Sequence, residues 1–464
     1  MIIRRGYVYW MGQTSILVLF LSLSQGHVFG DDTSWIQSMN AAAQYHQQAK
    51  YTEAEKTYLK ALLEAEKSPS DRVRLSTSLN HLALLYHEQG RYGEAEPLYL
   101  RALSLTERSP DPGGFDVAMT LNNIADLYRA RADYSKAEPL YLRALAILDG
   151  MTGPLHREVA KVLNNLAALR YAQGDYSQAE TLLTRALTTR EKAQTEESPD
   201  LARCLNNLAE VCRAEGRDSK ARSLYKRALS ILEKTRDPNH PDTAVTLTNL
   251  ASLNASEGKY SEAEKLYERA LGIFENVFGA LHPSVATGLD GLAALCYKER
   301  RFSQALDLHL RALAIREKTF GPEHPDVASS LNNLGAVYQK KKQYSEAEKL
   351  FQRALAIWEK RGSERLELAV SLNNLAQTYY EEGKYKEAAA LLQRSLAIKA
   401  KVLKPDDPGV AATLRDYALV LRKMKRKSEA TALEARAKGI HDRCGSGCQS
   451  AHTVDVLALR STGR

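Results

Sequence analysis

The chain has 464 residues, of which 44% are apolar and 26% are charged, and its formal net charge is +8 at pH 7. This composition argues against a disordered protein and leaves enough apolar surface to build a core. The positive charge lies at the two ends: Arg4 and Arg5 contribute +2, and residues 415–464 hold eleven Lys or Arg against five Asp or Glu. The body is near neutral, so we predict no nucleic-acid partner.

The N-terminus has the layout of a secretory signal peptide. Arg4 and Arg5 precede an apolar stretch from Ile16 to Leu23, and Gly30 supplies a small residue for cleavage. We expect residues 1–30 to be removed, which would place the mature protein in the periplasm or outside the cell. The alternative is a membrane anchor over residues 6–30, a segment without Asp, Glu, Lys or Arg between its end glycines, although its polar side chains make it a poor bilayer span.

Residues 34–438 consist of repeats with a period of 42 residues, interrupted once by a gap of 41 residues between Leu331 and Leu372. A degenerate copy precedes the first clear one, so the sequence predicts about ten copies. The leucines that mark the same position in the nine clear copies are Leu79, Leu121, Leu163, Leu205, Leu247, Leu289, Leu331, Leu372 and Leu414.

Each copy has the pattern of two short amphipathic helices. In residues 79–103 the apolar positions recur at i, i+3, i+4 and i+7, Gly90 then interrupts the pattern, and a second stripe of aromatic and small residues follows. Neither helix can bury its stripe without its partner and the next copy. The sequence therefore predicts an all-α solenoid of about ten antiparallel helix hairpins.

These residues resemble the tetratricopeptide repeat. Its pattern is met in this copy by Leu82, Ala83, Tyr86, Gly90, Tyr92, Ala95, Tyr99 and Ala102. The usual period is 34 residues, and the longer period, the SLNNLA and AEPLYLRALAI phrases and the His-Pro-Asp linker are similar to the kinesin light chain subfamily. The resemblance implies a right-handed superhelical solenoid that binds proteins.

The motor role of that subfamily is not implied by the resemblance. Those proteins work in the cytosol and pair through a heptad segment before the repeats, whereas this chain has an export signal there and no heptads. We therefore expect an exported bacterial protein of the kinesin light chain-like type.

A linker before the first helix of several copies explains the longer period. Asn239–Ala244, Leu281–Ala286 and Glu323–Ala328 each contain His-Pro followed by Asp or Ser. Proline is favoured at the first helical position, and an acidic residue there suits the helix dipole. The linker should therefore begin the first helix and lengthen it by roughly two turns.

The sequence predicts no enzyme and no cofactor or metal. His324, Asp326 and Ser329 have the residue types of a hydrolytic triad, but part of this string recurs in other copies, whereas a triad needs one converging site. No phosphate-binding loop, metalloprotease motif or nucleophile elbow occurs.

An asparagine ladder is the main candidate for ligand binding. The residue after each marker leucine lies about 100° from the core face of its helix, and the resemblance places the first helices on the concave surface. Amides can both donate to and accept from a peptide backbone. The alternative is that they hold neighbouring repeats in register, which we favour for the next asparagine in each copy. The candidates are Asn80, Asn122, Asn164, Asn206, Asn332 and Asn373.

Basic residues predominate among the variable positions on the same face, namely Arg129, Lys161, Arg203, Arg213, Lys298 and Lys340. They favour an acidic or carboxylate-bearing peptide, unless this face is simply solvated. We predict a non-enzymatic scaffold that binds a peptide or protein in the concave groove. The alternative is an envelope-assembly spacer that attaches through the basic run from Arg422 to Lys427.

The cysteines give weaker indications. Cys212 and Cys296 take the place of a core tyrosine, so we expect small buried side chains. Cys444 and Cys448 would either form a disulfide or bind a metal, and a lone pair is a weak metal signal. They lie in residues 439–464, which we expect to form a flexible tail.

Overall fold

The computed structural model describes residues 30–68, 70–108, 114–131, 133–152, 157–193, 198–235, 238–362, 365–403 and 405–444. Residues 1–29, which carry the signal peptide or anchor prediction, and residues 445–464 lie outside these ranges. The described part contains twenty α-helices and no strand. None of its helices is both long and apolar enough to cross a bilayer.

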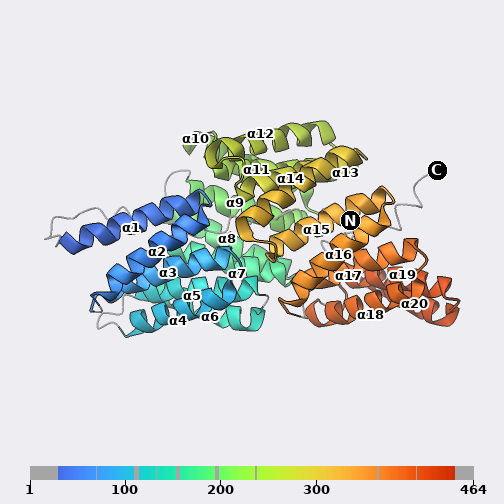
Figure 1. Ribbon diagram of the computed structural model, residues 1–464, viewed down its shortest axis with the longest axis horizontal. Coiled ribbons are helices and arrows are strands. Elements are labelled where there is room, and N and C mark those ends of the chain that lie inside the picture. The colour runs from blue at the N-terminus through green and yellow to red at the C-terminus, as the bar shows by residue number, and fades with distance from the viewer. Residues whose placement is uncertain are drawn as a thin grey trace.

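The helices form ten antiparallel hairpins that stack in chain order, so the predicted all-α solenoid is confirmed (Figure 1). The first helices of the hairpins are α1 (Gly30–Gln47), α3 (Arg72–Glu88), α5 (Gly114–Ala130), α7 (Arg157–Ala172), α9 (Pro199–Ala214), α11 (Pro241–Ser256), α13 (Pro283–Lys298), α15 (Pro325–Lys340), α17 (Leu366–Glu381) and α19 (Pro408–Lys423). The second helices are α2 (Tyr51–Glu66), α4 (Tyr92–Glu107), α6 (Tyr134–Thr152), α8 (Tyr176–Ala193), α10 (Asp218–Thr235), α12 (Tyr260–Phe278), α14 (Phe302–Phe320), α16 (Tyr344–Glu359), α18 (Tyr385–Val402) and α20 (Lys427–Cys444).

The core is a series of apolar clusters along the stack. In most hairpins a tyrosine or other large side chain of the second helix, such as Tyr99 or Tyr141, lies fully buried among leucines and alanines of the first. Burial of one such side chain stabilises the fold by about 1.5–3 kcal/mol. Each hairpin therefore depends on its neighbours. The helical array reaches beyond the predicted limits of 34 and 438, because Ile440 is buried in the last cluster.

The His-Pro linkers begin helices, as predicted. Pro241, Pro283 and Pro325 are the first residues of α11, α13 and α15. The preceding histidine has a role that the sequence did not predict: Nδ1 of His324 accepts a hydrogen bond from the backbone N–H of Asp326 at 3.1 Å. His240 and His282 do the same. These histidines are N-caps, a position usually taken by Ser, Thr, Asp or Asn.

The superhelix contacts itself after six hairpins. Nε2 of His324, at the start of α15, lies 3.3 Å from the carbonyl oxygen of Glu88, at the end of α3. Arg361, after α16, donates to the carbonyl of Gly90 at 2.6 Å, and Arg365, before α17, donates to that of Ala130 at 3.2 Å. We refer to these as the inter-turn contacts.

Candidate functional site

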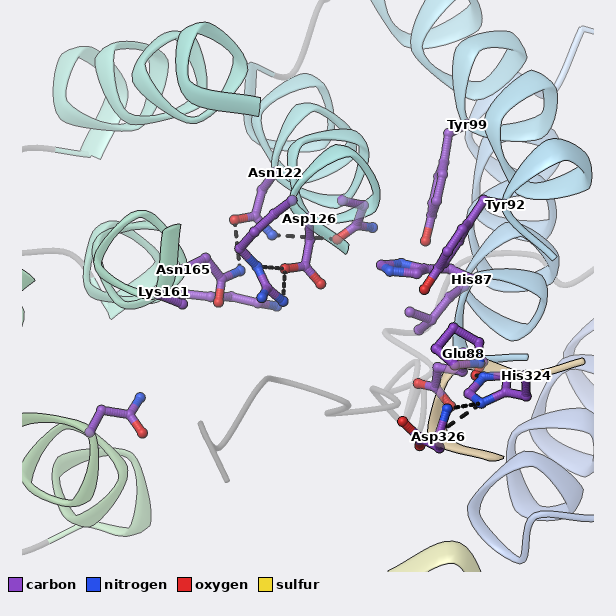
Figure 2. Close-up of a pocket in the computed structure, with 16 residues that line it drawn as sticks. His87, Glu88, Tyr92, Tyr99, Asn122, Asp126, Lys161, Asn165, His324 and Asp326 are labelled. Atoms are coloured by element: carbon purple, nitrogen blue, oxygen red, sulfur yellow. Dashed lines mark hydrogen bonds and ion pairs between the residues drawn. The ribbon is translucent and has the colours of Figure 1, made fainter. Parts of the chain in front are cut away.

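A chamber of about 230 Å³ lies inside the superhelix at this closure. One wall comes from α3 and α4 and includes His87, Glu88, Tyr92 and Tyr99. A second wall comes from α5, α7 and α9 and includes Asn122, Asn123, Asp126, Arg129, Lys161, Asn165 and Asn207. His324, Pro325 and Asp326 complete the lining from the next turn (Figure 2). The chamber therefore depends on residues more than 230 positions apart.

Asp126 and Arg129 neutralise one another on the second wall. Their side chains form an ion pair at 2.6 Å, and the hydroxyl of Tyr141 donates to the same carboxylate at 3.2 Å. Burial alone would raise the pKa of Asp126, but the charge of Arg129 and these hydrogen bonds hold it below its ordinary value. This pair adds polarity to the chamber without adding net charge.

Lys161 is the cation of the chamber lining that has no direct ion pair among the described residues. Burial lowers the pKa of its ammonium, and Arg203 lowers it further, while Glu158 acts in the opposite direction. Within the part of the chain that the structure describes, Lys161 forms neither an ion pair nor a hydrogen bond. Lys161 is half-buried, and a partly desolvated cation without a direct partner is costly. An anionic group of a ligand would find a favourable position here.

The first wall also carries an unsatisfied polar group. Tyr99 is fully buried, and its hydroxyl has no hydrogen-bond partner among the described residues. In Figure 2 the Tyr99 side chain lies beside Tyr92 and above His87, on the side of the chamber opposite Lys161. Burial lowers the pKa of His87, which favours a neutral imidazole. This wall can therefore offer aromatic surface and neutral hydrogen-bonding groups.

The asparagines form hydrogen bonds between successive repeats. Nδ2 of Asn165 donates to Oδ1 of Asn122 at 3.0 Å, and the bonds from Asn207 to Asn164 and from Asn249 to Asn206 have the same form, at 3.3 and 3.2 Å. These three first-set asparagines and Asn332 are buried between repeats, although the helical wheel placed them off the core. These asparagines therefore link successive repeats and hold them in register. Their contact with a ligand stays a prediction.

The other predicted site residues do not line the chamber. Asn80, Asn332 and Asn373 donate to a hydroxyl of the next repeat, and the carbonyl oxygens of their amides have no partner among the described residues. Arg203 and Arg213 are paired with acids, and Lys298 donates to a backbone carbonyl. Lys340 is half-buried on α15. The chamber therefore gathers Asn122, Arg129 and Lys161 from the predicted set.

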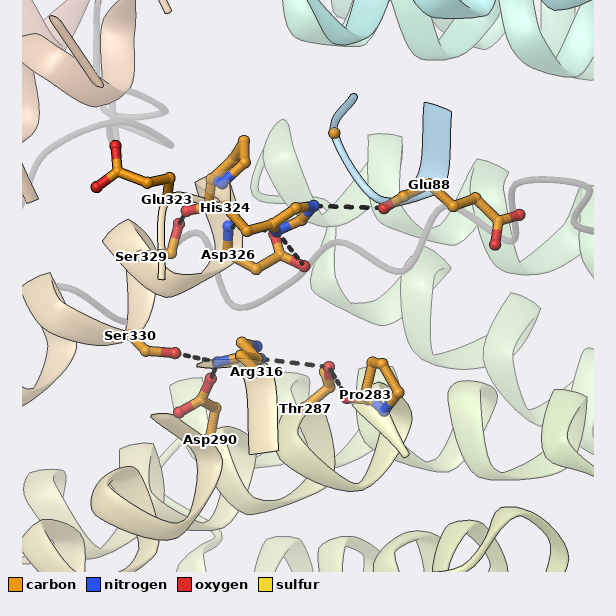
Figure 3. Close-up of polar contacts among 12 residues, drawn as sticks. Glu88, Pro283, Thr287, Asp290, Arg316, Glu323, His324, Asp326, Ser329 and Ser330 are labelled. Carbon is orange, nitrogen blue, oxygen red and sulfur yellow. Dashed lines mark hydrogen bonds and ion pairs between the residues drawn. The ribbon is translucent and has the colours of Figure 1, made fainter. Parts of the chain in front are cut away.

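The residue types of a hydrolytic triad do not converge. The hydroxyl of Ser329 donates to the carbonyl of Pro325, and His324 is occupied by Asp326 N–H and the Glu88 carbonyl (Figure 3). The described ranges hold no group of three or more His, Cys, Asp or Glu placed to bind a metal ion. Cys212 and Cys296 are buried, as expected for core positions. In the basic run, Arg422 pairs with Glu434 and Arg426 with Glu429.

The inter-repeat asparagine bonds lead to a stability prediction. We expect Asn206→Ala to lower the free energy of unfolding by about 1–3 kcal/mol, because the buried Asn249 amide would lose its acceptor. Urea denaturation followed by circular dichroism would measure this loss. In a double-mutant cycle with Asn249→Ala, the coupling free energy between the two positions should be about 1 kcal/mol. If the effects of the two substitutions were simply additive, the hydrogen bond would not contribute to stability.

A family model described as tetratricopeptide repeat matches residues 32–108, 74–150, 158–234, 205–276, 242–318, 284–360, 326–401 and 367–441. No curated protein is significantly similar in sequence to the chain.

Several solved structures are similar to this one. Repeats assigned to a kinesin light chain of Podosopora anserina share 28% identity over 45% of this chain and 99% of theirs, with a TM-score of 0.39. BtubC (BKLC) from P. vanneervenii shares 27% over 50% of this chain and 92% of its own, with a TM-score of 0.40. A Rap protein complexed with competence and sporulation factor shares 14% over 80% of this chain and 99% of its own, with a TM-score of 0.53.

Proposed function

Since the chain belongs to the tetratricopeptide repeat family, we propose that it is a non-enzymatic interaction scaffold that binds a peptide segment of a partner in the chamber. The observation that carries this proposal is that one cavity is lined both by Lys161, a cation without a direct ion pair, and by Tyr99, whose hydroxyl has no hydrogen-bond partner among the described residues. Buried polar groups usually have partners. A ligand would supply the partners that the described residues do not.

The position of Lys161 favours an acidic or carboxylate-bearing segment on its side of the chamber, whereas Glu88 and Asp326 line the opposite side. Asp126 already neutralises Arg129, so the charge of Lys161 remains for the ligand. Asn123 and Asn165 can contact a backbone without selecting its sequence. The Rap protein, which has a similar fold, was solved in complex with competence and sporulation factor, in keeping with a binding role for this kind of solenoid.

Peptide capture tests the proposal. We expect the mature chain to retain acidic members of an immobilised peptide library, and Lys161→Met to weaken that binding roughly tenfold or more, because a charge-assisted hydrogen bond contributes about 1.5–3 kcal/mol. Tyr99→Phe should weaken it less. Lys349→Met is the matched control, since Lys349 is exposed on α16.

Equal capture by the Lys161→Met and Lys349→Met variants would contradict the proposed site. We also propose that binding takes place outside the cytoplasm, as the N-terminal sequence predicts. Mass spectrometry of the mature N-terminus after cell fractionation would test that location, and an intact N-terminus in the cytoplasmic fraction would refute it.

A further inference from the structure

The inter-turn contacts follow one register along the chain. His282 lies close to the backbone of Gln47, at the end of α1. One repeat later His324 contacts the backbone of Glu88, and one repeat later again Arg365 contacts that of Ala130. The residue before the first helix makes the contact in three successive hairpins. The contact is therefore a repeating consequence of the pitch of the superhelix.

These contacts are sparse and mostly polar. Besides the hydrogen bonds they include the stacked rings of Tyr51 and Phe320, 5.9 Å apart, and the guanidinium of Arg361, 5.5 Å from the ring of Tyr92. No apolar cluster of the described residues combines side chains from hairpins 1–3 with side chains from hairpins 7–9. The two turns can therefore separate without exposing a hairpin core.

The residues that close the superhelix also line the chamber. Glu88 and Tyr92 contribute from one turn, and His324 and Asp326 from the other. We propose that the inter-turn contacts form a clasp, which must open for a peptide segment to enter or leave the chamber. The role of the chamber rests on the proposed function, whereas the clasp can be tested without any ligand.

Gly90 provides a variant with a matched control. A Cβ atom at Gly90 would lie 3.0 Å from Cδ2 of His324 and 3.4 Å from Nη1 of Arg361. Gly174 has the same place two repeats later and a similar φ of +75°, but a Cβ there would meet nothing within 4 Å. Both alanine variants carry the same backbone strain, so only Gly90→Ala should disturb the clasp.

Arg361 provides a second variant that does not alter the backbone. Arg361→Ala removes the hydrogen bond to the Gly90 carbonyl. Lys360→Ala is its control, because Lys360 is exposed and pairs with Glu323 on its own turn. If Gly90→Ala failed to fold, as judged by circular dichroism, Arg361→Ala would carry the test.

Spin labels across the clasp would report its closure. With Gly93→Cys and Pro322→Cys in the full mature chain, both at exposed positions, double electron–electron resonance should give one short distance. Gly90→Ala and Arg361→Ala should add a longer population that Gly174→Ala and Lys360→Ala lack. Identical distance distributions in all four variants would overturn the clasp.

Thiol labelling inside the chamber would report gating. Asn123→Cys lines the chamber, and a bulky polyethylene-glycol maleimide should react there in proportion to the open population. We expect roughly tenfold faster reaction in the two clasp variants than in the two controls, since loss of one hydrogen bond to a charged group shifts an equilibrium by about that factor. Cys444→Ser and Cys448→Ser remove competing thiols.

Equal reaction rates in all variants would overturn the gating role, even if the distances changed. Neither measurement uses a peptide, so failure of the clasp is distinct from failure of the peptide-capture experiment.

Discussion

Replacement of Asp290 by alanine is expected to lower the free energy of unfolding by about 3–5 kcal/mol, because it leaves buried charge without a partner. Asp290 accepts from Arg316 and lies 2.6 Å from Nδ1 of His309. The side chain of Arg316 is 1% exposed, and it also donates to Ser330 (Figure 3). Burial would raise the pKa of Asp290, but the charge of Arg316 and the hydrogen bonds with His309 and Arg316 hold it below the ordinary value.

Denaturation in urea, followed by far-UV circular dichroism, would measure this loss. Asp307→Ala is the control, since Asp307 is exposed on the same hairpin, and it should change stability by no more than about 0.5 kcal/mol. If Asp290→Ala also changed stability by no more than about 0.5 kcal/mol, the loss of its carboxylate would leave no costly buried charge on Arg316.

The repeats themselves supply a rescue variant. Repeat 3 has Asn122, Tyr141 and Leu148 at the positions of Asp290, His309 and Arg316. We expect the triple variant Asp290→Asn, His309→Tyr and Arg316→Leu to be much more stable than Asp290→Ala, because it removes every buried charge together. If the triple variant were the less stable of the two, the loss would come from packing.

Stability is expected to fall as the pH decreases from 6.5 to 4. Burial lowers the pKa of His282 to about 4, despite the opposing effects of Glu88 and the Gln47 backbone. In this window the unfolded chain binds a proton at this residue and the folded chain does not, so acid favours unfolding. The effect of His282 alone is about 3 kcal/mol, present in full above pH 6.5 and lost below pH 4.

His324 should act in the same direction. Burial lowers its pKa, Asp326 and the Glu88 backbone oppose this shift, and Arg361 and Arg316 add to it. Protonation of Nδ1 would also remove the acceptor that caps α15. The two histidines therefore link the clasp to pH.

Serine substitutions would separate titration from capping. Ser198 caps α9 by accepting from the N–H of Leu201, so His282→Ser and His324→Ser should keep a cap without a titrating ring. Urea denaturation at a series of pH values should give a flatter curve for the double variant. His81 and His87, whose pKa values are also lowered by burial, are present in the wild type and in the double variant, so their effect cancels in the comparison. If stability fell equally with pH in the two proteins, His282 and His324 would not be the source of the pH dependence.

The hairpins could be predicted from sequence because each apolar stripe is local and the period repeats it ten times. The prolines of the linkers were equally informative, since proline at a first helical position needs no neighbour to be recognised. The capping role of His324 was missed, because Nδ1 reaches its own backbone only when the ring is held in place, here by stacking on Phe320 at 4.2 Å.

The chamber could not be predicted in the same way. Lys161 and Asn122 were candidates because they lie on the first helices, but Tyr99 has the same residue type and spacing as the core tyrosines of other repeats. The last three residues of the lining, His324, Pro325 and Asp326, come from a turn six hairpins away. The distance between the turns depends on small rotations accumulated along the stack. The asparagine pairs do have a sequence signal: the two partners are separated by one repeat plus one residue, as Asn122 and Asn165 are.

The six-hairpin register also limits the number of repeats that the chain can carry. A solenoid without self-contact can lose an internal repeat at little cost, because each repeat meets only its neighbours. Deletion of residues 205–246 here would bring His324 opposite Gln47 and Arg365 opposite Glu88, so every pair that now joins the turns would be exchanged. Gain or loss of repeats between α3 and α15 is therefore constrained in this protein as it would be in a closed ring, while changes beyond α17 are not.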